Sequence, residues 1–441
     1  MKDKKTLIYI IIIIVLTILL GTLWYFIINI TKNTYSEDTN NSSSQTYIAN
    51  KEITKNENIS NKKYNSTKAD ENAILVTGNI KANLSNITVT KTGDSSGGDN
   101  TSFYGTNSAI LAKSGAILNI KNSTIKTTAT GANGVFSYGG SATTSNASGD
   151  GTTVNISNSK ITTTKDNSGG IMTTGGGVMN ATNLTINTAG TSSAAIRSDR
   201  GGGTVTVNKG TYTTTGKGSP AVYSTANITV KNAKLISKAS EGLVIEGKNK
   251  INLDNVTLID TNNTLNGQST TYKNIFIYQS MSGDADTGTA EFSSKDSTIT
   301  TNKGDTLYVT NTKAKITLEN NTFINNDKTG NLLRIQKDSW GNSGSNGGDV
   351  TLLLKNQKVK GNIVVDSISK LSMSLTKSSN YEGTINSNNT AKEIKLVLDS
   401  TSKIKLTGDS YISELDDSDT TYSNIDLNGY KLYVGGKELK K

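Results

Sequence analysis

Arginine is rare in this chain, and two of its three arginines flank one aspartate. The segment reads Arg197-Ser198-Asp199-Arg200 and is followed by three glycines, while the third arginine is Arg334. A guanidinium fork suits carboxylate, sulfate or phosphate groups, and glycine lets the backbone approach a ligand closely. An Arg–Asp ladder that locks neighbouring repeats together explains the same segment equally well. Both interpretations stay open from the sequence.

The residue types that most often carry out enzymatic chemistry are missing. The chain has no histidine and no cysteine, which removes the commonest general base, the commonest metal ligand and all disulfides. Residues 284–288 (DADTG) match only part of a calcium-binding loop, because the later ligands are missing. The sequence therefore predicts no catalytic residue, no metal ligand and no cofactor, with calcium kept only as a weak alternative.

A strand motif with an asparagine bend repeats along the chain, and it predicts the architecture in which the arginines are placed. Its copies include Ile120-Lys-Asn122-Ser-Thr-Ile125, and successive bends lie 36 residues apart (Asn122 after Asn86) or 23 apart (Asn255 after Asn232). Alternating β-branched residues indicate strands, and repeats of this length are typical of stacked architectures. Asparagine tolerates left-handed backbone geometry, and its amide can bond to the asparagine of the next repeat.

The repeat predicts an all-β fold, a parallel β-helix or solenoid. Short strands, tight turns and a one-dimensional repeat favour this architecture over a β-sandwich, which would not need the same text in every repeat. We expect the β-helix to span residues 73–411, with residues 412–441 forming a C-terminal coil and cap.

The other half of each repeat aligns into columns. One apolar column and a second, small or apolar column are expected to point into the core, because strand side chains alternate. The column between them then points outward, and it is rich in apolar and aromatic residues. Such a stripe usually marks a binding surface; the alternative is that loops such as residues 139–150 or 283–291 cover it. The outward column contains Leu111, Phe136, Met172, Arg197, Tyr223, Val244, Phe276, Tyr308 and Arg334.

The candidate binding residues come from this stripe and from the column beside it. Aromatic rings, carboxylates and arginines are the groups expected to contact a glycan or a protein partner there. The predicted binding residues are Tyr138, Arg197, Asp199, Arg200, Tyr223, Glu246, Phe276, Tyr278, Tyr308 and Arg334.

The N-terminal segment predicts a membrane anchor. Residues 6–30 carry no charge and are long enough to span a bilayer, and three lysines precede them, which favours a cytoplasmic N-terminus at residues 1–5. The polar residues 31–72 predict a flexible linker. We therefore expect a single-pass protein of the cell membrane with an extracellular C-terminal domain. A cleaved signal peptide is the alternative.

Three segments carry a resemblance to a known family. Residues 194–207 (AAIRSDRGGGTVTV), 219–230 (SPAVYSTANITV) and 241–249 (EGLVIEGKN) resemble bacterial right-handed parallel β-helix proteins of the pectate-lyase-like superfamily, in particular adhesin-like surface members. The resemblance covers roughly residues 73 to 435 and implies a right-handed β-helix. The superfamily contains lyases, hydrolases, glycan binders and adhesins, and the histidine-bearing and paired-aspartate motifs of its pectin hydrolases have no match here.

These observations predict a membrane-anchored extracellular scaffold that binds a polysaccharide or a cell-surface protein without catalysis. One alternative is a polysaccharide lyase that acts on an acidic glycan with Arg197 or Arg200 as its base, and another is a passive structural surface protein. The net charge of +10 is spread over scattered lysines. Because no basic cluster is present, we expect no nucleic-acid partner.

Overall fold

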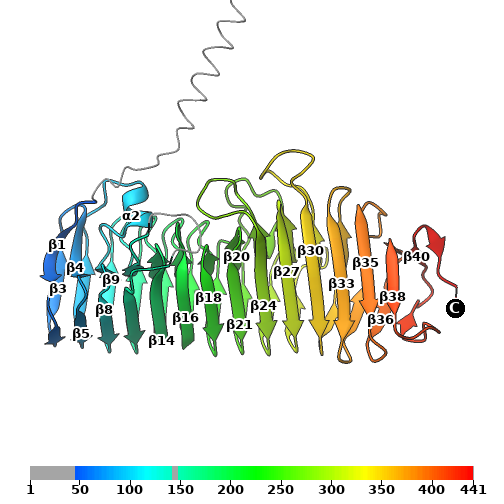
Figure 1. The fold of residues 1–441 in the computed structure, drawn as a ribbon, viewed down its shortest axis with the longest axis horizontal. Helices are drawn as coiled ribbons and strands as arrows, with labels where there is room; N and C mark the ends of the chain where they lie inside the picture. Colours follow the sequence, from blue (N-terminus) through cyan, green and yellow to red (C-terminus); the bar gives the residue numbers. More distant parts are fainter. Residues whose placement is uncertain (1–44, 142–147, 441) are drawn as a thin grey trace, which may run out of the picture. The chain divides into compact units, whose positions relative to one another are not determined.

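The protein is a stack of short parallel strands that wind coil upon coil in sequence order (Figure 1). The structure is a computed structural model and describes residues 45–141 and 148–440. Each strand pairs in parallel with the equivalent strand one coil further on, for example β10 (Val135–Tyr138) with β13 (Ile171–Thr174). The predicted all-β fold and the parallel β-helix architecture are therefore confirmed.

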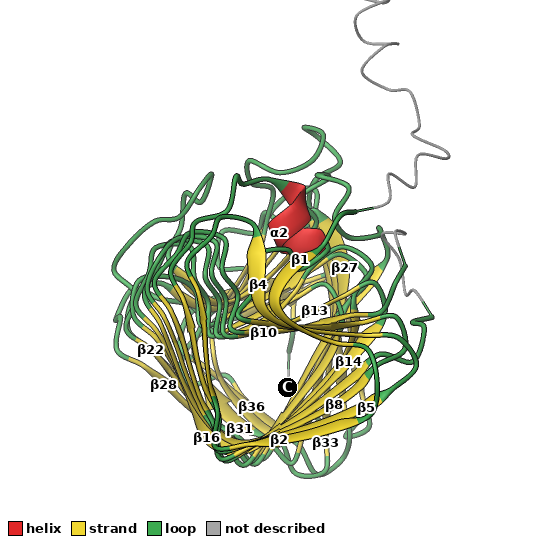
Figure 2. Cartoon of the chain, turned by 90° about the vertical axis from the view of Figure 1, so that its left-hand side faces the viewer, coloured by secondary structure: helices red, strands yellow, loops and turns green. Residues whose placement is uncertain are grey.

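Within the described residues the strands form two long sheets. One is a 12-stranded sheet. Viewed along the stack, this sheet forms one side of the coil, and α2 (Asp99–Phe103) and long loops lie over its outer face (Figure 2). Its strands are β1 (Ile48–Ile53), β4 (Glu71–Thr77), β7 (Ile110–Lys113), β10, β13, β15 (Ile196–Ser198), β17 (Val222–Ser224), β20 (Leu243–Glu246), β23 (Lys273–Tyr278), β26 (Asp305–Thr310), β29 (Leu333–Ile335) and β32 (Ile363–Val365).

The second long sheet has 22 strands in the described part of the chain and bends at the repeated asparagine. Strands before the bend are β2 (Glu57–Ser60), β5 (Lys81–Ser85), β8 (Ile117–Lys121), β11 (Thr153–Ser157), β18 (Asn227–Lys231), β21 (Lys250–Asp254), β24 (Thr289–Lys295), β27 (Thr312–Glu319), β30 (Gly348–Lys355), β33 (Lys370–Thr376), β35 (Glu393–Leu398) and β38 (Glu414–Asp417). Strands after it are β3 (Lys63–Ser66), β6 (Thr88–Lys91), β9 (Thr124–Thr127), β12 (Lys160–Thr163), β19 (Lys234–Ser237), β22 (Thr257–Asp260), β25 (Thr298–Thr301) and β28 (Thr322–Asn325). β14 (Gly177–Thr188) and β16 (Gly203–Thr214) run through it.

The asparagine bend has the predicted geometry. Asn86, Asn122 and Asn158 have φ values of 53°, 51° and 47°, in the left-handed region that asparagine tolerates better than most residues. The side-chain amide of Asn183 donates to Asn158 Oδ1 at 2.8 Å, and that of Asn255 donates to Asn232 at 2.8 Å. We call this column the bend ladder. These bonds link neighbouring coils at the point where the chain turns.

The core is filled by the two inward columns predicted from the sequence. Parallel pairing places Ile110, Val135 and Ile171 in register, and each is at most 1% exposed. The second inward column is equally buried, although Ser137 and Ser198 stand where later coils carry Ile245 and Ile277. Because each coil contacts mainly its two neighbours, the core grows by one layer per coil.

The predicted transmembrane helix is corrected by the structure. No helix in residues 45–141 or 148–440 is long and apolar enough to cross a membrane. Residues 6–30 lie outside the described residues. The fold class is therefore stated without that helix, as an all-β stack of parallel strands.

The predicted flexible linker is wrong for its second part. β1, β2 and β3 form the first coil, and together with the start of β4 they lie inside residues 31–72; Ile53 is 1% exposed. β1 pairs with β4, and β2 pairs with β5. The polar composition hid these strands because only one side chain in each short strand needs to reach the core.

The C-terminal end keeps the parallel stacking beyond the predicted boundary at residue 411. β31 (Lys358–Lys360), β34 (Asn380–Gly383), β36 (Lys403–Leu406) and β39 (Ile425–Asp426) form a smaller parallel sheet. β37 (Ser410–Ile412) pairs in parallel with β40 (Leu432–Val434). The last pair, β40 with β41 (Lys437–Glu438), is antiparallel and ends the stack.

Candidate functional site

The predicted outward stripe does point away from the core, but loops cover most of it. Its apolar members form two clusters separate from the main core. The N-terminal cluster contains Leu75, Leu111, Phe136 and Met172, and the aromatic cluster contains Val244, Phe276 and Tyr308. Tyr308, Phe136 and Leu111 are fully buried. The expectation of an open aromatic stripe is therefore wrong, and the alternative of a covered face is confirmed.

Of the segments suggested by the sequence, residues 283–291 reach the stripe, because Asp284 lines a pocket together with Arg197 and Tyr223. The loop at residues 92–109 packs on the N-terminal cluster, and Gly105 (φ 75°) approaches so closely that a Cβ there would lie 2.8 Å from Leu111 Cδ1. Trp340, from the loop at residues 336–347, lies 5.1 Å from the Phe276 ring over the aromatic cluster. Burial of large apolar side chains favours such packing, because each contributes roughly 1.5–3 kcal/mol when removed from water.

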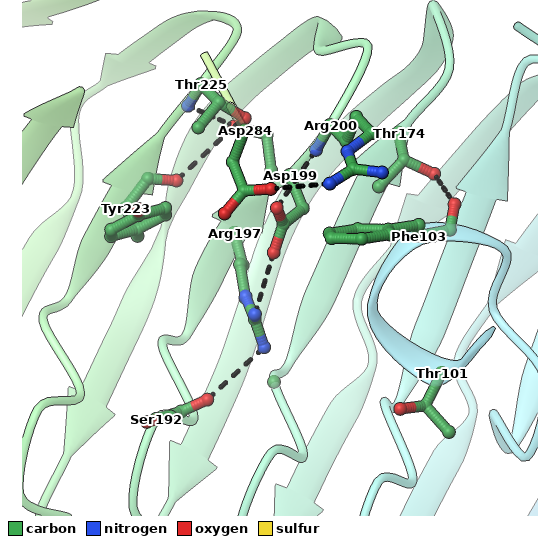
Figure 3. Close-up of polar contacts among 12 residues, drawn as sticks. Thr101, Phe103, Thr174, Ser192, Arg197, Asp199, Arg200, Tyr223, Thr225 and Asp284 are labelled. Atoms are coloured by element: carbon green, nitrogen blue, oxygen red, sulfur yellow. Dashed lines mark hydrogen bonds and ion pairs between the residues drawn. The ribbon is translucent and has the colours of Figure 1, made fainter. Parts of the chain in front are cut away.

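A polar cleft lies between the two covered clusters (Figure 3). Two adjoining pockets of about 280 and 210 Å³ share Arg197, Asp199 and Asp284 as lining residues. Arg197 comes from β15, Asp199 from the turn after it, and Tyr223 from β17 one coil on. Residues 97–103 contribute to one wall, and Asp284 comes from a loop that follows β23.

Both arginines of this cleft are already paired with carboxylates. Arg197 donates to Asp199 Oδ2 at 2.8 Å and to the Ser192 carbonyl at 3.3 Å. Arg200 donates from its guanidinium to Asp284 Oδ1 at 3.1 Å and from its backbone N–H to Asp199 Oδ1 at 3.0 Å. Burial raises the pKa of Asp199 to about 6, against the opposing charge of Arg197. The charges of the cleft therefore balance without a ligand.

Arg200 also joins the two walls of the cleft. Its guanidinium stacks on the Phe103 ring at 4.1 Å while it pairs with Asp284 (Figure 3). Phe103 ends α2, and Asp284 lies almost two hundred residues further along the chain. Arg200 therefore connects α2 to the loop that carries Asp284.

The carboxylate of Glu246, on the coil after Tyr223, accepts hydrogen bonds from three hydroxyl groups. Tyr223, Tyr278 (3.2 Å) and Ser280 donate these bonds, and Glu246 is 1% exposed. Burial, with the neighbouring Tyr278 and Glu246, raises the pKa of Tyr223 well above its ordinary value. Tyr223 is therefore neutral at physiological pH and serves as a donor, which does not suit a general base.

The cleft gathers only part of the predicted binding residues. Arg197, Asp199, Arg200 and Tyr223 meet there, and Glu246 is bonded to Tyr223. The others lie elsewhere. Tyr138 is in contact with Tyr104 beside the N-terminal cluster, Phe276, Tyr278 and Tyr308 belong to the aromatic cluster or pack against it, and Arg334 pairs with Asp305 at 2.5 Å.

Sequence reasoning missed the residues that the loops supply. Asp284 and Phe103 stand outside the repeat, so no column placed them near Arg200. The signal available was the acidic segment 284–288, which we interpreted as a fragment of a calcium loop. Among the described residues no group of three or more Asp or Glu side chains is arranged to hold a metal ion.

Comparison of the chain with protein-family models, curated proteins and solved structures finds no match. The strand pairing establishes a parallel β-helix, and membership of the pectate-lyase-like superfamily stays a prediction.

Proposed function

We propose that this chain is a non-catalytic extracellular binding protein for a neutral, hydroxyl-rich glycan, and that the polar cleft is its binding site. The observation that carries the proposal is the set of fixed polar groups around one cleft: Arg197, Asp199, Asp284 and Tyr223. Sugar hydroxyls need donors and acceptors side by side, and binding sites place a small number of such groups in a concave surface. The resemblance to β-helix surface proteins supports the same proposal.

The charge balance favours a neutral ligand. An acidic glycan would need a free guanidinium, but Arg197 and Arg200 each pair with a carboxylate. Breaking a partly buried pair to bind a new anion leaves the original carboxylate without its partner, which costs free energy. The same pairs argue against the lyase alternative, because each guanidinium is already held by a carboxylate and is not directed at a substrate.

Binding is tested with the full chain in affinity electrophoresis against soluble β-glucan, glycol chitin and polygalacturonate. We expect retardation by a neutral polysaccharide and at least a tenfold loss of affinity in Asp199→Asn and in Tyr223→Phe. Asp305→Asn is the matched control, because it weakens the similar Arg334 ion pair outside the cleft.

Three outcomes would overturn the proposal. Retardation by polygalacturonate with release of unsaturated ends would support the lyase. Equal binding by Asp199→Asn and the unsubstituted chain would remove the cleft as the site. A lack of retardation by all three polysaccharides would support a structural protein or a protein partner.

A further inference from the structure

A second asparagine ladder runs along the outer face of the 22-stranded sheet. Asn58, Asn83, Asn119, Asn155 and Asn180 stand at equivalent positions on β2, β5, β8, β11 and β14. From Asn83 onward, each side-chain amide donates to the asparagine of the preceding coil, at distances of 2.6, 2.8, 2.9 and 2.9 Å along the series. We call this column the face ladder, to distinguish it from the bend ladder.

The coil geometry does not require the face ladder. The bend ladder places asparagines at positive φ, whereas the face ladder lies within extended strands, where asparagine is disfavoured. In the next two coils the same column holds Thr206 and Thr229, and these pair in unbroken register with Asn180. Threonine therefore suffices for the fold at this position, and the five consecutive asparagines need another explanation.

The surface is hollowed where the face ladder runs. A groove of about 620 Å³ is lined by all five face-ladder asparagines. Its rim includes Ser85 and Ser157, and its one charged lining residue is Lys121. A groove without carboxylates and with one amine suits a neutral ligand. The coincidence of groove and ladder points to a ligand that contacts the amides.

The ladder prepares these amides for hydroxyl groups. Each amide spends one N–H on its neighbour and retains a second N–H and an oxygen lone pair. Because the ladder already holds the side chains in place, a ligand does not have to immobilise them, which reduces the entropy cost of binding. The amides repeat at the strand spacing of about 4.8 Å, and an extended pyranose chain advances by a similar distance per sugar.

We propose that the groove binds an extended, neutral polysaccharide that lies along the stack, with about one sugar per coil. A peptide is a poorer match, because peptides that join sheets pair with an open strand edge, and the strands below the groove are paired on both sides from β5 to β14. This site lies on a different sheet from the polar cleft and does not rest on the function proposed for that cleft.

The test compares a triple variant with a matched control in the full chain. Asn83→Thr, Asn119→Thr and Asn155→Thr together replace the centre of the face ladder with the residue that the next two coils use. Asn252→Thr is the control, because Asn252 lies in the same column beyond the groove. The probes are soluble mixed-linkage β-glucan and cello-oligosaccharides, and melting temperatures show that each variant is folded.

Measured in the Asp199→Asn background, in which the cleft no longer contributes, the triple variant should lose at least tenfold in affinity, while Asn252→Thr should retain it. Equal affinity in the triple variant, or no binding of either probe by the unsubstituted chain, would overturn the proposal and leave the ladder a structural role. Loss of all binding in Asp199→Asn, with full retention in the triple variant that keeps Asp199, would overturn it in favour of the cleft.

Discussion

The two long sheets share one pairing scheme but have opposite outer faces. The 12-stranded sheet points large apolar side chains outward, and the loops at residues 92–109 and 336–347 pack over them. The 22-stranded sheet points asparagine, threonine and lysine outward and carries exposed ion pairs such as Lys250–Glu291. The outward residues therefore determine whether a face of the solenoid is covered by loops or stays exposed to solvent.

Buried charged groups occur at strand ends in both long sheets. Lys273 has no exposed side-chain surface, lies 4.0 Å from Glu241 and stacks on Phe276 at 4.3 Å. Burial lowers the pKa of Lys273. Asp260 ends β22, where the chain leaves the sheet for the loop that leads to Lys273, and burial raises its pKa to about 8. The loop between β22 and β23 is therefore flanked by two buried groups, Asp260 and Lys273, whose pKa values are shifted by burial.

The largest predicted effect tests whether covering makes the outward stripe part of the core. Tyr308→Ala should destabilise the protein by about 3–5 kcal/mol, because it removes a fully buried ring and leaves a cavity under Trp340. Thr317→Ala on the open face of the same coil should cost about 0.5 kcal/mol or less. Urea unfolding followed by circular dichroism measures both. Similar costs for the two variants would contradict the distinction between covered and open faces.

The second prediction concerns pH and the root of the covering loop. The pKa of Asp260 is higher in the folded protein than its ordinary value of 3.8, so the folded state holds the proton that the unfolded state releases. The stability supplied by this group is complete below pH 4 and is lost as pH rises through about 8, at up to about 1.4 kcal/mol per pH unit. Asp260→Asn should remove this slope.

The difference in unfolding free energy between Asp260→Asn and the unsubstituted protein is measured from pH 5 to pH 9. The variant should gain relative stability as pH rises to about 8, and the difference should then level off. A difference that stays constant with pH would show that Asp260 ionises with an ordinary pKa.

The third prediction separates the two asparagine ladders. Asn122→Ala in the bend ladder should cost about 1–2 kcal/mol, because alanine pays the full penalty of left-handed backbone geometry at φ 51°. Asn119→Thr in the face ladder should cost less than about 0.5 kcal/mol, because it keeps a strand-forming residue at an extended position. The midpoints of thermal unfolding compare the two. A larger loss for Asn119→Thr would mean that the face ladder is needed for folding.

The smallest predicted effect concerns Arg200. Arg200→Ala should reduce global stability by less than about 1 kcal/mol, because its ion pair with Asp284 is about one-third exposed. Hydrogen exchange should instead accelerate locally in residues 97–103 and 281–286, since the contact that joins these two loops is lost. Arg334→Ala is the control, as it lies outside the cleft. Unchanged exchange in both loops would show that they are positioned independently.

The repeat made the stacked part of the fold predictable. The inward columns at Ile110 and Ile196 and the left-handed bend at Asn122 follow from local alternation and from the conformational tolerance of asparagine. The sequence did not predict the first coil, because Ile53 and Ile59 stand alone among polar neighbours. The segment therefore shows no hydrophobic alternation that would indicate strands.

Only those residues of the candidate site that lie in or next to the strands could be predicted from the sequence. Arg197 and Tyr223 occupy the outward column, so their proximity followed from the register. Asp284 and Phe103 come from loops whose course depends on packing over apolar side chains rather than on any repeat. The burial of Tyr308 could not be predicted either, because an outward position in a strand does not show whether a loop covers it.

The strand register also allows whole coils to be gained or lost during evolution. Thr229 and Asn252 occupy equivalent positions 23 residues apart, so an excision between two such points rejoins strands that already match. Recombination between repeated gene segments would thus shorten or lengthen the molecule by steps of about 4.8 Å, because the rejoined strands keep the same pairing and core packing. Variants of this gene should therefore differ in length by whole coils rather than by scattered insertions within strands.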